Sequence, residues 1–190
     1  MKKEKLTLPI FPLPIFLLPN GITRLRIFEP RYLKLVKIAT KEKGFIILLQ
    51  SQSSELSGIE WGSWVEIINF DQGEDGVLEI DVKCKSLVRV LSLVKKEEEL
   101  QFCAVSEILH WSQEIEKTKF NALSASLEAV FENDEKLNDL YHDKPTNNTN
   151  WVVARWLELL PVKLEIKNSF VYDHTFQEAE SFVQSIILKD

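Results

Sequence analysis

The chain contains few of the residues that build disulfide frameworks, metal sites and phosphate-binding loops: two cysteines, three histidines and six glycines among 190 residues. Cys84 and Cys103 lie in strand-like segments without Cys-x-x-Cys spacing, which is typical of small buried side chains in a reducing compartment. His110, His142 and His174 stand far apart, without a partner at ligand spacing. The sequence therefore predicts a cytoplasmic protein with no disulfide, no metal and no cofactor.

Catalytic and nucleotide-binding motifs are also missing. None of the glycines begins a Gly-x-x-x-x-Gly-Lys-Ser/Thr loop, so the sequence offers no site for ATP hydrolysis. The chain has neither a Gly-x-Ser-x-Gly elbow nor a His-Glu-x-x-His helix. Its 29 carboxylates, on a chain of net charge −6, are typical of a solvated surface. These absences favour a binding protein over an enzyme.

A long apolar stretch near the start has the wrong residues for a secretory signal. Residues 8–19 contain no polar side chain, but four of the twelve are proline. Each interior proline costs roughly 3 kcal/mol in the continuous helix that a signal requires. The prolines also argue against the middle of a sheet, so we expect extended segments packed on a core. No run in the chain approaches the roughly 18 apolar residues of a membrane span, so no membrane association is predicted.

Residues up to about His110 have the pattern of strands, interrupted by one helix. Residues 77–84 alternate between apolar and polar side chains, as a half-buried strand requires. Residues 72–76 are predicted to form a hairpin turn, and residues 95–99 are predicted to form a second, solvated turn. Pro30 suits the first position of a helix whose apolar residues repeat at helical spacing.

After Trp111 the apolar residues repeat with a period of 3.6, which indicates helices. An apolar stripe predicts a long helix over residues 120–141, with a stop or kink near Asp134. Residues 151–160 predict a short helix, and the capping-box pattern that begins at Thr175 opens a last one.

This change of period divides the chain into two lobes. Strands followed by helices predict the α+β class, with segregated layers. We expect a β-rich lobe over residues 1–110 and an α-helical lobe over residues 111–190, which together form one continuous unit.

Three motifs near the start form a distinctive series: Phe11-Pro-Leu-Pro14, Leu17-Leu-Pro-Asn-Gly21 and Leu25-Arg-Ile-Phe-Glu-Pro-Arg-Tyr32. In these motifs the chain resembles the amino-terminal, substrate-binding domain of Lon proteases. The resemblance continues more loosely along the chain, through residues 44–49, 62–68, 75–80, 88–91 and 156–163. It therefore spans nearly the whole sequence.

The resemblance implies a fold and a function. The fold is a small PUA-like β-barrel or pseudo-barrel with one helix, followed by a C-terminal helical bundle. The function is that of a stand-alone, non-catalytic protein- or peptide-binding module, which lacks the ATPase and protease modules of Lon. Its partners would be unfolded or hydrophobic protein segments, with a protease or chaperone beside it, and a homodimer is one alternative. An ATP-dependent peptidase activity does not follow from the resemblance alone.

Aromatic side chains are the candidates for protein binding, because tryptophan is enriched in binding hot spots as well as in cores. Trp61 and Trp64 are two of these candidates, and the position of Trp61 next to Gly62 predicts an exposed loop. Phe11 and Phe16, in the apolar opening segment, are the other two.

Positive charge is concentrated in residues 1–44, which hold ten Lys/Arg against three acids, net +7, whereas the rest holds 13 against 26, net −13. Arg31, Lys34, Lys37 and Lys41 lie along one face of the predicted helix and would form an anion or RNA patch, an alternative function. The pI near 5.3 and the lack of an aromatic-rich basic strand disfavour nucleic acid. The solvated side of an amphipathic helix explains the stripe more simply.

Overall fold

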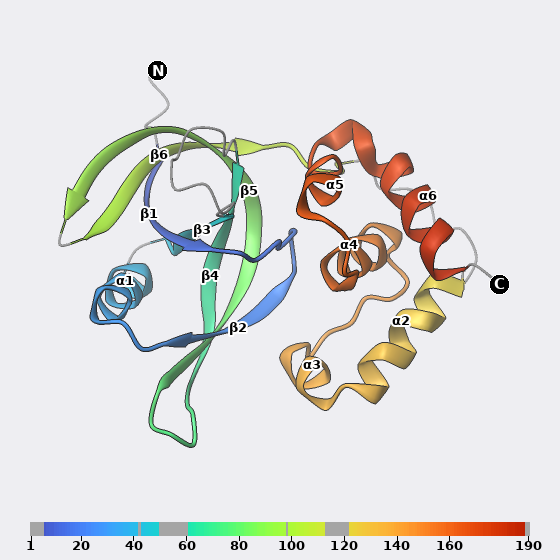
Figure 1. The fold of residues 1–190 in the computed structure, drawn as a ribbon, viewed down its shortest axis with the longest axis horizontal. Helices are drawn as coiled ribbons and strands as arrows, with labels where there is room; N and C mark the ends of the chain where they lie inside the picture. The colour runs from blue at the N-terminus through green and yellow to red at the C-terminus, as the bar shows by residue number, and fades with distance from the viewer. Residues whose placement is uncertain (1–5, 42, 50–60, 98, 113–121, 189–190) are drawn as a thin grey trace. The chain divides into compact units, whose positions relative to one another are not determined.

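The computed structural model describes residues 6–41, 43–49, 61–97, 99–112 and 122–188 (Figure 1). By its internal contacts the chain divides into two units, residues 1–108 and 109–190, and each unit is described by itself. The described part of the first unit contains six strands and one helix, and that of the second contains helices. The predicted α+β class is therefore confirmed.

The first unit is a sheet that closes on itself. Its strands are β1 (Leu6–Leu13), β2 (Ile22–Ile27), β3 (Phe45–Leu49), β4 (Trp61–Gln72), β5 (Leu78–Glu97) and β6 (Leu100–Ile108), and its helix is α1 (Pro30–Lys41). The strand order is β2-β5-β4-β3-β1-β6, and β5 also pairs with β6, which closes the barrel. The barrel-like first lobe and the helix that begins at Pro30 were both predicted from the sequence, and both are confirmed.

Strand β5 closes the barrel because it is long enough to have different neighbours along its length. Residues 78–83 pair with β2, residues 78–89 pair with β4, and residues 87–97 pair with β6. The turn predicted at residues 72–76 is confirmed. The turn predicted at residues 95–99 is shorter than expected, since β5 continues to Glu97 and β6 begins at Leu100.

The proline-rich opening segment lies inside the sheet, so the expectation that proline excludes it from there is wrong. Strand β1 pairs with β6 through residues 6–9 and with β3 through residues 10–13. Each half of β1 therefore has a strand on one side only. Pro9 and Pro12 fall in different halves, so neither residue has to donate hydrogen bonds on both sides of a ladder.

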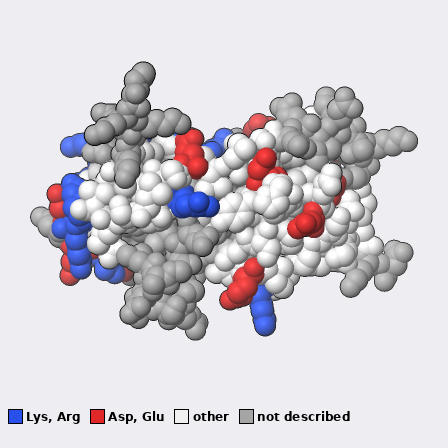
Figure 2. Space-filling view, turned by 90° about the horizontal axis from the view of Figure 1, so that it is seen from above, with Lys and Arg blue, Asp and Glu red and all other residues white. Residues whose placement is uncertain are grey.

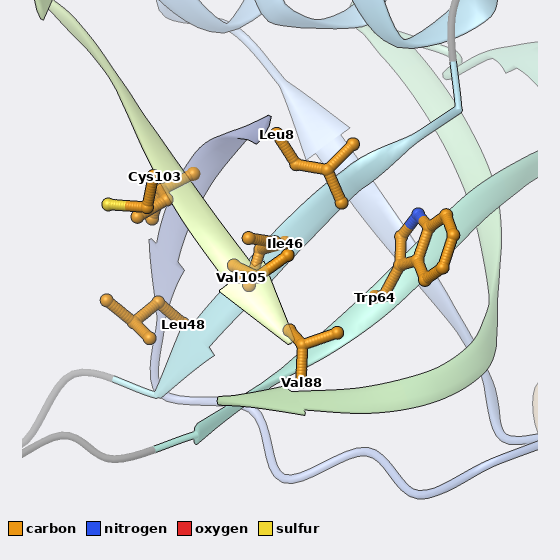
Figure 3. Close-up of a cluster of buried hydrophobic side chains, with 8 residues drawn as sticks. Leu8, Ile46, Leu48, Trp64, Val88, Cys103 and Val105 are labelled. Carbon is orange, nitrogen blue, oxygen red and sulfur yellow. The ribbon is translucent and has the colours of Figure 1, made fainter. Parts of the chain in front are cut away.

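Apolar side chains from five strands fill the barrel (Figure 3). The buried cluster consists of Leu8, Ile10, Ile46, Leu48, Trp64, Val88, Cys103 and Val105, with Leu6 and Val90 packed against it. Both cysteines are buried thiols outside any disulfide, as predicted, and burial raises the pKa of the Cys103 thiol. Helix α1 adds a second apolar contact, in which the ring of Tyr32 stacks on Phe11 with 3.9 Å between ring centroids.

The second unit is helical. Its elements are α2 (Ala122–Asn133), α3 (Glu135–Leu140), α4 (Thr149–Leu159), α5 (Leu164–Asn168), the 3-10 turn η1 (Asp173–Thr175) and α6 (Phe176–Ile187). The predicted break near Asp134 is confirmed, because the Asp134 side chain accepts a hydrogen bond from the Leu137 N–H at 3.0 Å and starts α3. Within the described residues, no helix is both long and apolar enough to span a membrane.

The predicted capping box at the start of α6 is wrong, although the helix begins where the pattern indicated. The Thr175 side chain makes no capping hydrogen bond. Its hydroxyl donates to the Tyr172 carbonyl at 2.7 Å and accepts from the Trp111 indole at 3.3 Å. The hydroxyl therefore connects segments of the helical unit that are distant in sequence.

Candidate protein-binding surface

The four aromatic residues predicted to bind protein all lie in the first unit, and all are buried. Phe11 packs between Tyr32 and Phe45, with 6.1 Å between its ring centroid and that of Phe45. Phe16 meets Trp61 edge to face, with 5.6 Å between ring centroids. These rings pair with one another inside the fold.

Trp61 and Trp64 both lie in β4, so the exposed loop predicted for Trp61 is wrong. Their exposed fractions are 6% and 8%. The Trp64 indole donates a hydrogen bond to the Lys43 carbonyl at 2.6 Å, and the Lys85 ammonium lies 4.6 Å from the centre of its ring. The geometry gives both rings a packing role, and their part in binding stays a prediction.

The basic residues predicted as a stripe lie on α1, as expected from their spacing. Lys34, Lys37 and Lys41 are exposed, whereas Arg31 is half-buried and pairs with Glu29 at 2.8 Å. The Arg31 guanidinium also lies 4.7 Å from the centre of the Tyr32 ring. Arg31 is therefore held by neighbours at the start of the helix, and the accessible part of the stripe consists of the three lysines.

Among the described residues of the first unit, the most concentrated apolar exposure is on the second half of β5. We call residues 90–97 the β5 edge, because in the described chain they pair with β6 and have no strand on their other side. Leu91, Leu93 and Val94 lie within four residues and have exposed fractions of 47%, 51% and 52%. Large apolar side chains that remain half in water at a strand edge are typical of an interaction surface.

Two irregularities bend this edge. The register between β5 and β6 shifts between Val90 and Ser92, and again between Leu93 and Lys95. Leu91 and Val94 are the residues skipped by the ladder, so each occupies a β-bulge, which bends the strand and increases its twist. These bulges allow three apolar side chains to remain exposed within four residues.

Charged side chains surround the β5 edge. Arg89 and Lys96 are exposed at its two ends, and Lys95 forms an ion pair with Glu97 at 2.9 Å. The Lys95 ammonium also lies 4.5 Å from the centre of the Phe102 ring. Figure 2 shows lysine and arginine atoms, with aspartate and glutamate atoms among them, at the left-hand end of the face drawn, the end at which α1 and the β5–β6 hairpin lie in Figure 1.

The β5 edge also contains a Ser-x-x-Lys spacing, at Ser92 and Lys95, which is the spacing of some nucleophile pairs. The ammonium of Lys95 is hydrogen-bonded to Glu97 rather than to the Ser92 hydroxyl. Among the residues that the structure describes, no group of three His, Cys, Asp or Glu side chains is arranged to hold a metal ion.

The titratable groups with shifted pKa values in the second unit have structural partners. Burial lowers the pKa of His110 to about 4, and its neutral ring donates a hydrogen bond to the Val171 carbonyl at 2.6 Å. Burial also lowers the pKa of Lys167, whose ammonium donates to the Glu158 carbonyl at 3.1 Å. Hydrogen bonds from Ser112 lower the pKa of Asp173. These contacts tie segments of the helical unit together.

Sequence reasoning missed the β5 edge. It identified residues 87–94 as a strand and assigned residues 95–99 to a turn, which left no reason to expect an exposed apolar row. The only sequence signal is the loss of alternation over Leu91, Leu93 and Val94, which in isolation is also compatible with a buried strand.

Comparisons with known proteins agree with this description. The family described as the ATP-dependent protease La (LON) substrate-binding domain matches residues 7–168. A crystal structure of a Lon N-terminal domain protein from Xanthomonas campestris is similar, with 28% identity, a TM-score of 0.65, and coverage of 91% of this chain and 95% of that one. The N-terminal domain of a Mycobacterium avium complex Lon protease shares the fold, with 12% identity, a TM-score of 0.59, and coverage of 96% and 98%. The comparison with curated proteins gives no match. The chain belongs to the Lon substrate-binding domain family.

Proposed function

We propose that this chain is a protein-binding module that captures extended apolar segments of other proteins and has no catalytic activity of its own. The observation that supports the proposal is the exposed row of Leu91, Leu93 and Val94 on a strand segment that, among the described residues, has a neighbour on one side only. An extended polypeptide is the ligand that such a strand suits, since it offers main-chain hydrogen bonds and apolar side chains together.

The proposed affinity is modest. A module that samples unfolded segments needs a Kd near 1 µM, which corresponds to about −8 kcal/mol. Apolar contacts at a half-exposed strand contribute part of this, and ordering of a flexible client opposes it. A protease or a chaperone that receives the client is the partner that this role implies.

The proposal is tested by mixing the full chain with a fluorescently labelled unfolded protein, with and without ATP. Anisotropy follows binding, and gel electrophoresis follows cleavage. We expect saturable binding that is independent of ATP, with the client left intact. Cleavage of the client would contradict the non-catalytic role, and absence of binding would contradict the protein-binding role.

RNA binding at the basic face of α1 is the second candidate function. The observation in its favour is the exposure of Lys34, Lys37 and Lys41 along one face of a helix. If RNA binds there, its affinity falls steeply with salt, and the double substitution Lys37→Glu/Lys41→Glu abolishes it. The same double variant leaves capture of an unfolded protein unchanged if the first proposal is correct.

A further inference from the structure

We propose that the client binds as an added strand along the β5 edge, and that the preferred client has an apolar centre flanked by acidic residues. This inference rests on the proposed function and names its site and its ligand chemistry. Three features of the described residues support it: the free side of the strand, the bulged apolar row, and the positions of two cations.

The first feature is the pairing of β5. Residues 87–89 pair with β4 on one side and β6 on the other, whereas residues 90–97 pair, within the described ranges, with β6 alone. Backbone N–H and C=O groups on the free side of a strand are directed away from its partner and are available to another chain. An extended segment added there continues the sheet beyond the end of β4.

The second feature, the bulged apolar row, favours a flexible client over a second copy of this chain. Leu91 and Val94 occupy the two bulges, and the strand bends at each of them. A second β5 has the same bulges and would have to match them in an antiparallel register. An unfolded segment adjusts its own backbone and follows the bend, while Leu93 and its neighbours contact its apolar side chains.

The third feature is charge. Arg89 and Lys96 lie at the two ends of the row, and within the described residues neither has an ion-pair partner, whereas Lys95 is paired with Glu97. The seven residue steps between the two cations correspond to about 20 Å of strand. Carboxylates near both ends of an eight-residue client would meet them, so the preferred client is acidic at its ends and apolar between.

A rival edge exists on β4 and differs in charge. Residues 66–72 of β4 pair with β5 and, within the described chain, have no strand on their other side. Ile68 and Phe70 are exposed there, with Glu66 and Asp71 beside them. This edge would prefer a basic client. The charge of the client therefore distinguishes the two edges.

The experiment uses three labelled eight-residue peptides and the 190-residue chain. All three have the same centre of valine, isoleucine and threonine. One has an aspartate at each end, one has a lysine at each end, and one has aspartate ends with a proline in the centre. We expect the aspartate-ended peptide to bind at least about threefold more tightly than the lysine-ended one. Since the whole chain has net charge −6, bulk electrostatics favours the opposite order.

Variants locate the binding. Arg89→Glu/Lys96→Glu should reverse the preference between the two charged peptides, and Leu93→Thr should weaken binding of all peptides about fivefold. The proline-containing peptide should bind about tenfold more weakly, because proline removes a ladder hydrogen bond. Lys37→Glu/Lys41→Glu, which changes net charge equally on α1, and Phe70→Thr, which alters the β4 edge, should leave the order of the peptides unchanged.

Several results would overturn the inference. If the unfolded protein binds but Arg89→Glu/Lys96→Glu and Leu93→Thr have no effect, the β5 edge is not the site, although the proposed function stands. If Phe70→Thr removes binding instead, the client lies on β4. If light scattering shows a dimer that Leu93→Thr dissociates, the edge belongs to a second copy. If neither protein nor peptide binds the unaltered chain, the proposed function itself is wrong.

Discussion

Strand β5 has two halves with different surroundings: residues 78–83 lie between β2 and β4, whereas residues 90–97 pair with β6 and with no other strand that the structure describes. In the first half, Ile80 and Val82 are fully buried. In the second half, Leu91 and Leu93 remain about half exposed. One strand therefore combines a segment buried between two neighbours with a segment whose apolar side chains are half exposed.

We call residues 78–83 the central half, because they lie between two strands, and residues 90–97 the edge half. Ion pairs on its polar face also hold the central half in place. Arg24 of β2 contacts both carboxylate oxygens of Asp81, at 2.7 and 2.9 Å, and Asn69 of β4 donates to the same carboxylate at 3.1 Å. The hydrogen bond to Asp81 raises the pKa of Arg24 above its ordinary value. Arg26 contacts Asp75 and Glu79 on the same face. Asp81 therefore joins three adjacent strands, and the β5 edge has no equivalent contact among the described residues.

The contacts of the two halves predict different roles for them. A bidentate pair between an arginine and a well-covered carboxylate is stronger than an exposed ion pair, which contributes about 0–1 kcal/mol. Substitutions in the central half should therefore lower the free energy of unfolding. Side chains of the edge half should matter little for folding and more for binding.

The substitution Ile80→Ala should change the free energy of unfolding the most. Ile80 is fully buried in the central half, so its truncation should lower stability by about 2–5 kcal/mol. The matched substitution Leu93→Ala removes a side chain that is half exposed, and should lower stability by about 1 kcal/mol or less. Urea denaturation followed by tryptophan fluorescence measures both values.

Peptide binding completes this test. Leu93→Ala should weaken peptide binding, whereas Ile80→Ala, measured where it remains folded, should not. Equal losses of stability for the two variants would show that the halves of β5 do not differ in the way that their neighbours indicate.

The next effect in size is that of the central ion pair. Asp81→Ala leaves Arg24 and Asn69 without their shared acceptor, and should lower stability by about 1–3 kcal/mol. The control in the edge half is Glu97→Ala, which removes the exposed partner of Lys95 and should change stability by no more than about 0.5 kcal/mol. Thermal unfolding followed by circular dichroism compares the two variants. A similar loss for both would show that the Asp81 contacts stabilise no more than a surface pair does.

The sequence predicted the central half of β5 better than its edge. Residues 77–84 alternate because one face is buried and the other is polar, and this local pattern follows directly from the environment. The exposure of Leu91, Leu93 and Val94 depends instead on where β4 begins and on two bulges, which are consequences of long-range pairing. The amino-acid sequence of an apolar run does not show whether another strand covers it.

The other incorrect predictions, for Trp61, for the prolines of β1 and for Thr175, have the same origin. Gly62 beside Trp61 suggested a loop, but strand β4 already starts at Trp61 and packs its ring against Phe16. The prolines of β1 suggested exclusion from the sheet, whereas the strand changes partner between its two halves. The capping box at Thr175 does not form because its hydroxyl donates to the nearby Tyr172 carbonyl and accepts from the distant Trp111 indole. Local patterns predicted each element and could not show which distant residue would meet it.

The smallest effect is electrostatic and concerns the Asp75 carboxylate in the turn that follows β4. A hydrogen bond from Arg26, supported by the Val77 N–H, holds the pKa of Asp75 below its ordinary value. Because the folded-state pKa is depressed, the contact stabilises the fold fully above the unfolded-state pKa, and this stabilisation is lost as pH falls through the folded-state value. The small contribution of this exposed pair should therefore disappear at acidic pH, while the buried side chains of β5 remain packed.

Arg26→Gln removes the first cause of this shift and should return the pKa of Asp75 toward its ordinary value. An NMR titration of the side-chain carboxyl carbon measures the change directly. Arg24→Gln is the matched control, because Arg24 hydrogen-bonds Asp81 rather than Asp75, and it should leave the Asp75 titration where it is. If both substitutions shift the titration of Asp75 equally, the two arginines act on this carboxylate through their positive charge at long range. The specific contact between Arg26 and Asp75 would then not be the cause of the lowered pKa.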